Sequence, residues 1–250
     1  MGRAFEFRKA RKLKRWSKMA KTFTRIGKDI SMAVKEGGPN PDTNSRLRQI
    51  IQNARSANMP KDNIERAIKK ASGKDATNYI EISLEGYSAF GVAVFVDCTT
   101  DNNNRTVANV RSYFNKFEGR LGTNGSLEFI FDKKGVFYLN KEKIPFSLDQ
   151  FEMQLIDAGL EEMQVEGESI IVFVEFGNFN EMSNFLESIK IDIETAEVQR
   201  IPNNFKSVDI DQAELVLKLI DKLEEDEDVQ SVYHNMLMTN EIIALIEKNR

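Results

Sequence analysis

Three patterns predict an α+β fold: an N-terminal three-helix domain followed by two ferredoxin-like α+β domains, the middle one discontinuous. Apolar residues recur every three or four positions before residue 77, which is typical of helices, whereas from Tyr79 onward they alternate as in strands. Between residues 134 and 206 the order strand-helix-strand-strand-helix-strand is that of a ferredoxin-like unit. The third pattern is the distribution of charge, because the residues before 77 are basic and the remaining residues are acidic.

The first module is strongly basic. Residues 1–76 contain 20 Lys/Arg and 7 Asp/Glu, a net charge of +13, whereas residues 77–250 contain 15 and 32, a net charge of −17. The whole chain is therefore only mildly acidic, at −4. Such an asymmetry predicts a basic module that meets a polyanion, nucleic acid or an anionic membrane, attached to an acidic body.

Several classes of function are excluded or disfavoured by composition. No apolar run approaches the roughly 18 residues of a membrane span, and no secretory signal is present. Cys98, the single cysteine, lies in an apolar strand-like run and predicts a buried, inert thiol; His234 is the single histidine. Zinc sites and histidine-based triads are thereby excluded. We expect a cytoplasmic, non-enzymatic protein with no catalytic residue, metal, cofactor, small-molecule substrate or membrane partner.

Three helices are predicted in the domain spanning residues 1–76. The first has an apolar face that includes Phe23 and Val34, and Gly37-Gly38-Pro39 ends it. Asp42 or Thr43 can cap the second helix. The third helix begins near Pro60, which suits a first turn, and ends at Ser72-Gly73.

The middle domain is predicted to consist of residues 77–133 plus 207–250. Its first part contains the strand patterns "YIEISLE", "VAVFVDC" and "SLEFIF", with a helix before the third. The later helix around Val216 and the strand "VQSVYH" have no sheet of their own, so we expect them to return to this one. Thr239 is expected to cap a short closing helix. The inserted ferredoxin-like domain would then be residues 134–206.

The candidate nucleic-acid-binding side chains are all in the basic module. The first 28 residues hold 11 Lys/Arg and one Glu, with aromatic side chains interleaved. Such a segment suits phosphate contacts and base stacking, although a solvated tail and an organelle transit peptide are alternatives. The predicted residues of this arm are Arg8, Lys9, Arg11, Lys12, Lys14, Arg15, Trp16, Lys18, Lys21 and Arg25. A second basic patch is predicted on the surface of the helices, at Arg46, Arg48, Lys69 and Lys70.

The string "TDNNNRT", Thr100–Thr106, lies where a buried strand leads into a helix. Asp101 or Asn102 can cap that helix. The remaining Asn103, Asn104 and Arg105 exceed what one cap needs, so they are candidates for a contact loop. The glycine-rich "GRLGTNGS" lacks the Lys-Ser/Thr ending of a phosphate loop and predicts turns, and the run "EEDED" predicts a solvated surface.

Several strings together resemble the YebC/PmpR family, which includes mitochondrial translational activators of cytochrome oxidase. They are "GGPNPDTNSRLR", "NMPKDNIERAIKKA", "EGY", "TDNNNRT", "GRLGTNGSLEFIF" and "EVQRIP", in that order from Gly37 to Pro202. The resemblance implies one helical and two α+β domains. This chain departs from the family at its start, where "GRAFEFRKARKLKRW" replaces the usual Gly-His-Ser-Lys-Trp, so roles of that opening do not transfer.

The family resemblance also implies a function. Members are described as DNA-binding transcriptional regulators, and others act at the ribosome on difficult stretches such as consecutive prolines. We therefore expect a nucleic-acid-binding regulator of gene expression. Its partner would be DNA or ribosomal RNA, the second as part of the ribosome.

Overall fold

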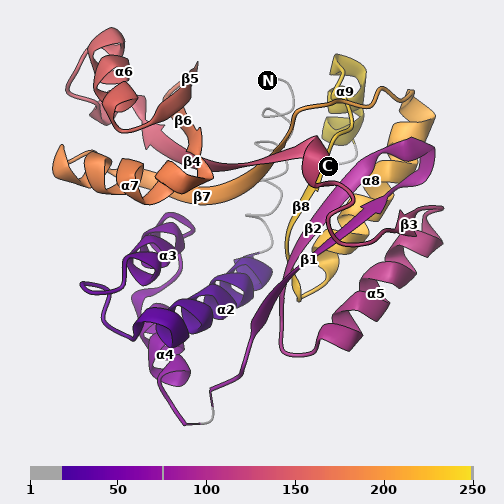
Figure 1. Cartoon of the computed structure of the whole chain (residues 1–250), viewed down its shortest axis with the longest axis horizontal. Helices are drawn as coiled ribbons and strands as arrows, with labels where there is room; N and C mark the ends of the chain where they lie inside the picture. Colours follow the sequence, from indigo (N-terminus) through magenta and orange to yellow (C-terminus); the bar gives the residue numbers. More distant parts are fainter. Residues whose placement is uncertain (1–18, 75, 249–250) are drawn as a thin grey trace.

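The computed structural model describes residues 19–74 and 76–248, and it confirms the predicted α+β fold class. A bundle of three helices lies against two four-stranded antiparallel sheets, each with its own pair of helices (Figure 1). The first sheet is built from segments that are far apart in the sequence, whereas the second is contiguous. No helix in the described ranges is long and apolar enough to cross a membrane.

The helical domain consists of α2 (Met19–Gly37), α3 (Ser45–Ser56) and α4 (Lys61–Ala71). Its core includes Ile30, Leu47 and Ala54, all fully buried. The predicted cap of α3 was one or two residues too early: Asn44, and neither Asp42 nor Thr43, accepts the Leu47 N–H. The Asn44 amide also donates to carbonyls at the end of α2, so one side chain closes both helices.

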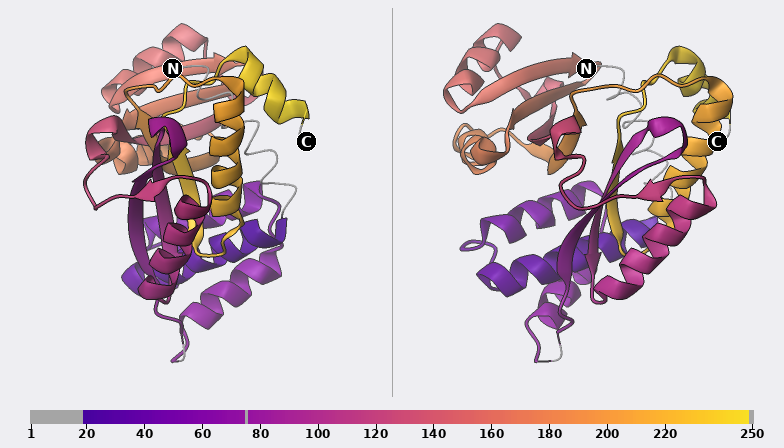
Figure 2. Two further views of the ribbon diagram at one scale, coloured as in Figure 1. Left: turned by 90° about the vertical axis from the view of Figure 1, so that its right-hand side faces the viewer. Right: turned by 45° about the vertical axis from the view of Figure 1, so that its right-hand side comes forward.

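The first sheet has the strand order β3-β1-β2-β8. Strand β8 (Val229–His234) pairs antiparallel with β2 (Ala93–Thr100), so the late segment does return to the early sheet. Helices α5 (Asn103–Lys116) and α8 (Ile210–Glu225) share one apolar core with one sheet face, and α9 (Asn240–Lys248) adds to it (Figures 1 and 2). The remaining strands are β1 (Ile80–Tyr87) and the two-residue β3 (Arg120–Leu121).

The expected strand at "SLEFIF" was wrong. Its central residues form the 3-10 turn η2 (Glu128–Ile130). The physical reason is Glu85, which is only 3% exposed and whose carboxylate accepts the backbone N–H groups of Gly125 and Leu127 at 2.7 and 2.6 Å. These bonds hold the backbone in a turn, and they give "GRLGTNGS" the turn role that its glycines predict.

The second sheet has the strand order β5-β6-β4-β7, with α6 and α7 on one face, which is the ferredoxin-like arrangement. Its strands are β4 (Phe131–Asn140), β5 (Leu160–Glu166), β6 (Ser169–Glu175) and β7 (Ile193–Pro202), and its helices are α6 (Leu148–Asp157) and α7 (Phe179–Ser188). The three domain limits stay a prediction, and the predicted boundary at residue 133 falls inside β4.

Candidate nucleic-acid interface

Three basic residues on one face of α2 dock this helix onto the middle domain. Lys21 Nζ donates to the Glu225 carbonyl at 2.9 Å, and Arg25 donates to the Glu224 carbonyl at 2.7 Å. Both carbonyls belong to the last turn of α8, where the helix dipole favours cations. Lys21 and Arg25 were predicted to bind nucleic acid, and the structure instead places them in a contact between domains.

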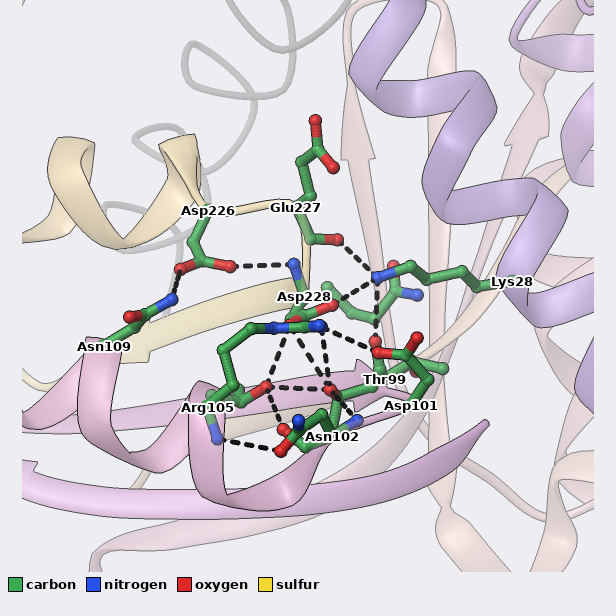
Figure 3. A network of polar contacts seen from close by, with 12 residues as sticks. Lys28, Thr99, Asp101, Asn102, Arg105, Asn109, Asp226, Glu227 and Asp228 are labelled. Atoms are coloured by element: carbon green, nitrogen blue, oxygen red, sulfur yellow. Dashed lines mark hydrogen bonds and ion pairs between the residues drawn. The ribbon is translucent and has the colours of Figure 1, made fainter. Parts of the chain in front are cut away.

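Lys28 completes this contact from inside the protein (Figure 3). Its ammonium group donates to the carbonyls of Thr99 and Glu227 at 3.0 and 2.8 Å and forms a 2.7 Å ion pair with Asp228. Each side chain of that pair is only 8% exposed. The three donors of a lysine ammonium are therefore all satisfied in a buried position.

Asp228 is the centre of the network in Figure 3. Its second carboxylate oxygen accepts from Arg105 at 2.6 Å and from the Thr106 hydroxyl at 2.9 Å. Burial alone would raise the pKa of Asp228, but the hydrogen bonds from Lys28, Arg105 and Thr106 outweigh it and lower the pKa to about 2. Asp228 is therefore a buried anion shared by helices α2 and α5.

The network explains most of "TDNNNRT". Asn102 caps α5 by accepting the Arg105 N–H at 3.1 Å, which confirms one of the two expected caps. Arg105 is bonded to both Asp101 and Asp228, so it is not a free contact residue as predicted. Asn103 and Asn104 are exposed, and their side chains make no hydrogen bond in the described part of the chain. They stay candidates for an external contact.

Helix α3 covers the outer edge of the second sheet. Strand β7 is an edge strand, and Asn53 of α3 both donates to the Ala196 carbonyl at 2.7 Å and accepts the Ala196 N–H at 3.1 Å. Gln52 and Ser56 donate to two more carbonyls of β7. These side chains replace the hydrogen bonds that a further strand would make, and they protect the edge. Figure 1 shows α3 along this strand.

The predicted second patch divides into two kinds of residue. Arg46 forms ion pairs with Glu36 and Glu81, so it joins α2, α3 and β1, and its predicted contact with nucleic acid stays a prediction. Lys69 and Lys70 are exposed on α4, and Arg48 is half-exposed on α3. These three side chains form no ion pair or hydrogen bond with other described residues, and the same holds for exposed Arg55.

Eight predicted side chains of the arm lie outside the described residues. They are Arg8, Lys9, Arg11, Lys12, Lys14, Arg15, Trp16 and Lys18.

A cleft of about 1880 Å³ separates the three domains around α3. Its lining contains ten Asp/Glu and seven Lys/Arg. Asp29 lies in this lining, and burial raises its pKa to about 7, against the attraction of Arg46. Arg48 and Arg55 lie on the α3 wall of the cleft.

Sequence reasoning missed the most important residues of the domain contact. Lys28 was one cation among many, and Asp228 belongs to the "EEDED" run that was expected to be solvated but is 5% exposed at this position. The strand-to-helix position of "TDNNNRT" was the available signal, but its partner lies more than a hundred residues away. Cys98 is buried as predicted, and burial raises its thiol pKa to about 12.

The described residues thus define a class of protein: a cationic helical domain clamped between two acidic α+β domains. A family model for the TACO1/YebC protein N-terminal domain matches residues 3–74, and one for the TACO1/YebC second and third domain matches residues 79–236. The chain belongs to the TACO1/YebC family.

Named relatives agree with this assignment. A probable transcriptional regulatory protein of Flavobacterium johnsoniae is 56% identical over 94% of this chain and 99% of its own length. A probable transcriptional regulatory protein of Parabacteroides distasonis is 53% identical over 94% of this chain and 97% of its own length. The crystal structure of a conserved hypothetical protein from Aquifex aeolicus covers 90% of this chain and 92% of its own, with 37% identity and a TM-score of 0.78.

Proposed function

We propose that this chain is a nucleic-acid-binding regulator of gene expression, of the transcriptional kind for which its bacterial relatives are named. The observation that supports this most is the division among its cations. Acidic partners within the chain account for Arg46 and Arg105, whereas Arg48, Arg55, Lys69 and Lys70 have none among the described residues. Unpaired cations on a mildly acidic protein suit phosphate contacts.

The arm adds to this surface. Residues 1–18 contain Arg3, Arg8, Lys9, Arg11, Lys12, Lys14, Arg15 and Lys18 against the single Glu6. We propose that these side chains supply most of the affinity and that the α3 and α4 cations supply the remainder. Phosphate contacts hold the protein on nucleic acid without reading its sequence, so specificity would come from elsewhere in the complex.

The test is the salt dependence of binding to duplex DNA and to a ribosomal RNA fragment. If about six cations contact phosphates, affinity falls on the order of a thousandfold between 50 and 200 mM salt. Deleting residues 1–18 should flatten this dependence while leaving Lys21 and its domain contact in place. Replacing Arg111 and Lys141, exposed on the acidic body, with Gln is the control. An unchanged slope after the deletion contradicts the role of the arm.

A second candidate is a translation factor that binds ribosomal RNA and relieves stalls at proline-rich stretches. One observation favours it: α3 is covered by β7, which leaves this helix unsuited to enter a major groove. Crosslinking in cells, followed by sequencing of both DNA and RNA, separates the two. Enrichment of promoter DNA supports the transcriptional proposal, and enrichment of ribosomal RNA replaces it with the second.

A further inference from the structure

The turn between β1 and β2 has an unusual residue at its tip. Phe90 has φ +64° and is followed by Gly91 at φ +74°, so the last two residues of the loop Ala89–Gly91 both have positive φ. Positions with positive φ favour Gly and Asn. A bulky aromatic residue with positive φ is an outlier that costs stability. Phe90 is nevertheless 44% exposed, so core packing gives little in return.

A second feature of the same turn also lowers the stability of the folded protein. Ser88 is 4% exposed, and its hydroxyl has no hydrogen-bond partner within residues 19–74 and 76–248. A buried, unsatisfied hydroxyl destabilises a folded protein. Ser88 and Phe90 thus both destabilise the same short turn. Two such features together are typical of a site selected for something other than stability.

Two more exposed phenylalanines are tethered to this turn. Asn203 donates its backbone N–H to the Ile130 carbonyl and its side-chain amide to the Phe129 carbonyl, at 2.9 and 3.1 Å. This holds the linker between β7 and α8 against η2. Phe129 is 72% exposed, and Phe205, two residues beyond Asn203, is 36% exposed.

The same linker reaches the hairpin. Lys206 donates its backbone N–H to the Asn235 carbonyl, and Asn235 donates its own to the Ala93 carbonyl at the start of β2, so the linker after Phe205 lies beside the hairpin. The β1–β2 turn and the linker lie at the same end of the molecule in both views of Figure 2. Phe90, Phe129 and Phe205 therefore lie on three segments that meet at this end of the molecule, and we call these three exposed residues the aromatic ridge.

We propose that the aromatic ridge, with Lys206, is a stacking surface for unpaired bases of single-stranded nucleic acid. The inference rests on the proposed function and adds the form of nucleic acid that is bound. Aromatic faces stack on any base, and a neighbouring ammonium group suits the phosphate backbone. Lys206 and Arg120, which is in register with Tyr87, make no side-chain bond to other described residues.

Two of the carboxylates near the ridge accept hydrogen bonds within the chain, whereas Glu128, beside Phe129, is exposed. Asp132 accepts the Asn203 amide, and Asp209 caps α8 by accepting the Gln212 N–H. The two cations are therefore left to a ligand, while these two acids bond within the chain. A phosphate-bearing ligand is therefore favoured by the aromatic faces and by Lys206 and Arg120.

The test uses the full chain and two probes of about 12 nucleotides: oligothymidylate, and an abasic oligonucleotide of the same length and charge. Phe90→Asn is the informative variant, because Asn suits the left-handed turn and removes the aromatic ring. It should weaken oligothymidylate binding about tenfold, leave abasic binding unchanged and keep the thermal midpoint at or above the wild-type value. Phe90→Trp should retain the affinity. Ile156→Asn, 59% exposed on α6, is the control and should change neither.

Other results overturn the inference in distinguishable ways. If Phe90→Asn binds both probes as the wild type does, the ridge is not a stacking surface and is reassigned to a protein partner, while the proposed function stands. Equal losses on both probes also contradict stacking. If the wild-type chain binds neither oligonucleotide nor duplex, the proposed function fails together with the ridge.

Discussion

The basic side chains of the helical domain and the elements beside it form two sets with different surroundings. The docked cations, Lys21, Arg25, Lys28 and Arg46, donate to carbonyls and carboxylates of other segments. The free cations, Arg48, Arg55, Lys69 and Lys70, have no such partner among the described residues. The two sets are interspersed in the sequence, so charge density alone does not distinguish a domain contact from a binding surface.

The largest expected effect comes from the centre of the docked set. Replacing Lys28 with Met leaves the buried Asp228 carboxylate without one of its two cations, and breaking such a pair costs about 3 kcal/mol of unfolding free energy. Urea unfolding measures the change. Lys69→Met, in the free set, is the control and should stay within about 0.5 kcal/mol. Equal effects for the two variants would remove the distinction between the sets.

Acid should weaken the same contact. The pKa of Asp228 is lowered from 3.8 to about 2 in the folded protein, so its contribution is present above pH 4 and is lost as pH falls toward 2. At 1.36 kcal/mol per pKa unit this contribution is about 2.5 kcal/mol. The wild type should lose unfolding free energy between pH 5 and pH 2. In Asp228→Asn this loss should be smaller by about that amount. A pH dependence that is the same in both proteins would contradict the buried anion.

The contact between α3 and β7 should be weaker, because it consists of neutral hydrogen bonds. Asn53→Ala removes the donor and the acceptor that Ala196 uses. We expect a loss of about 1 to 2 kcal/mol in unfolding free energy. Asn103→Ala, an exposed asparagine without a side-chain partner in the described ranges, is the control. No loss in Asn53→Ala would mean that packing, and not these bonds, holds the domains together.

Asp29, in the lining of the cleft, gives a second prediction of pH dependence. Its pKa is raised to about 7, so the folded state is favoured by protonation and becomes less stable as pH rises from about 4 through 7. Asp29→Asn should therefore stabilise the protein more at pH 8 than at pH 5, with a difference on the order of 2 kcal/mol. The difference between thermal midpoints at the two pH values measures this. Stabilisation of equal size at both would point to packing.

Local patterns were sufficient for most of the fold. Helical spacing located α2, α3 and α4, alternation located β1, and a continuous apolar run located β2, because these signals depend on neighbouring residues. The "SLEFIF" segment was mispredicted because its turn depends on Glu85, about forty residues earlier. The alternation of apolar residues was correct, but a buried carboxylate decided the conformation.

The candidate site was harder to predict for the same reason. The cap at Asn102 is local and was expected, whereas the pairing of Arg105 and Lys28 with Asp228 spans at least 123 residues. The sequence shows where cations are dense, but tertiary contacts determine which of them are paired within the chain. The remaining cations could not be identified without those contacts.

The most direct test reverses the free cations together. In Arg48→Glu, Arg55→Glu, Lys69→Glu and Lys70→Glu combined, each change is at a position without a partner in the described chain, so the thermal midpoint should move little. Affinity for nucleic acid, measured by fluorescence anisotropy at fixed salt, should fall at least tenfold, with a shallower salt dependence. Undiminished affinity, or loss of the fold, would contradict the division between docked and free cations.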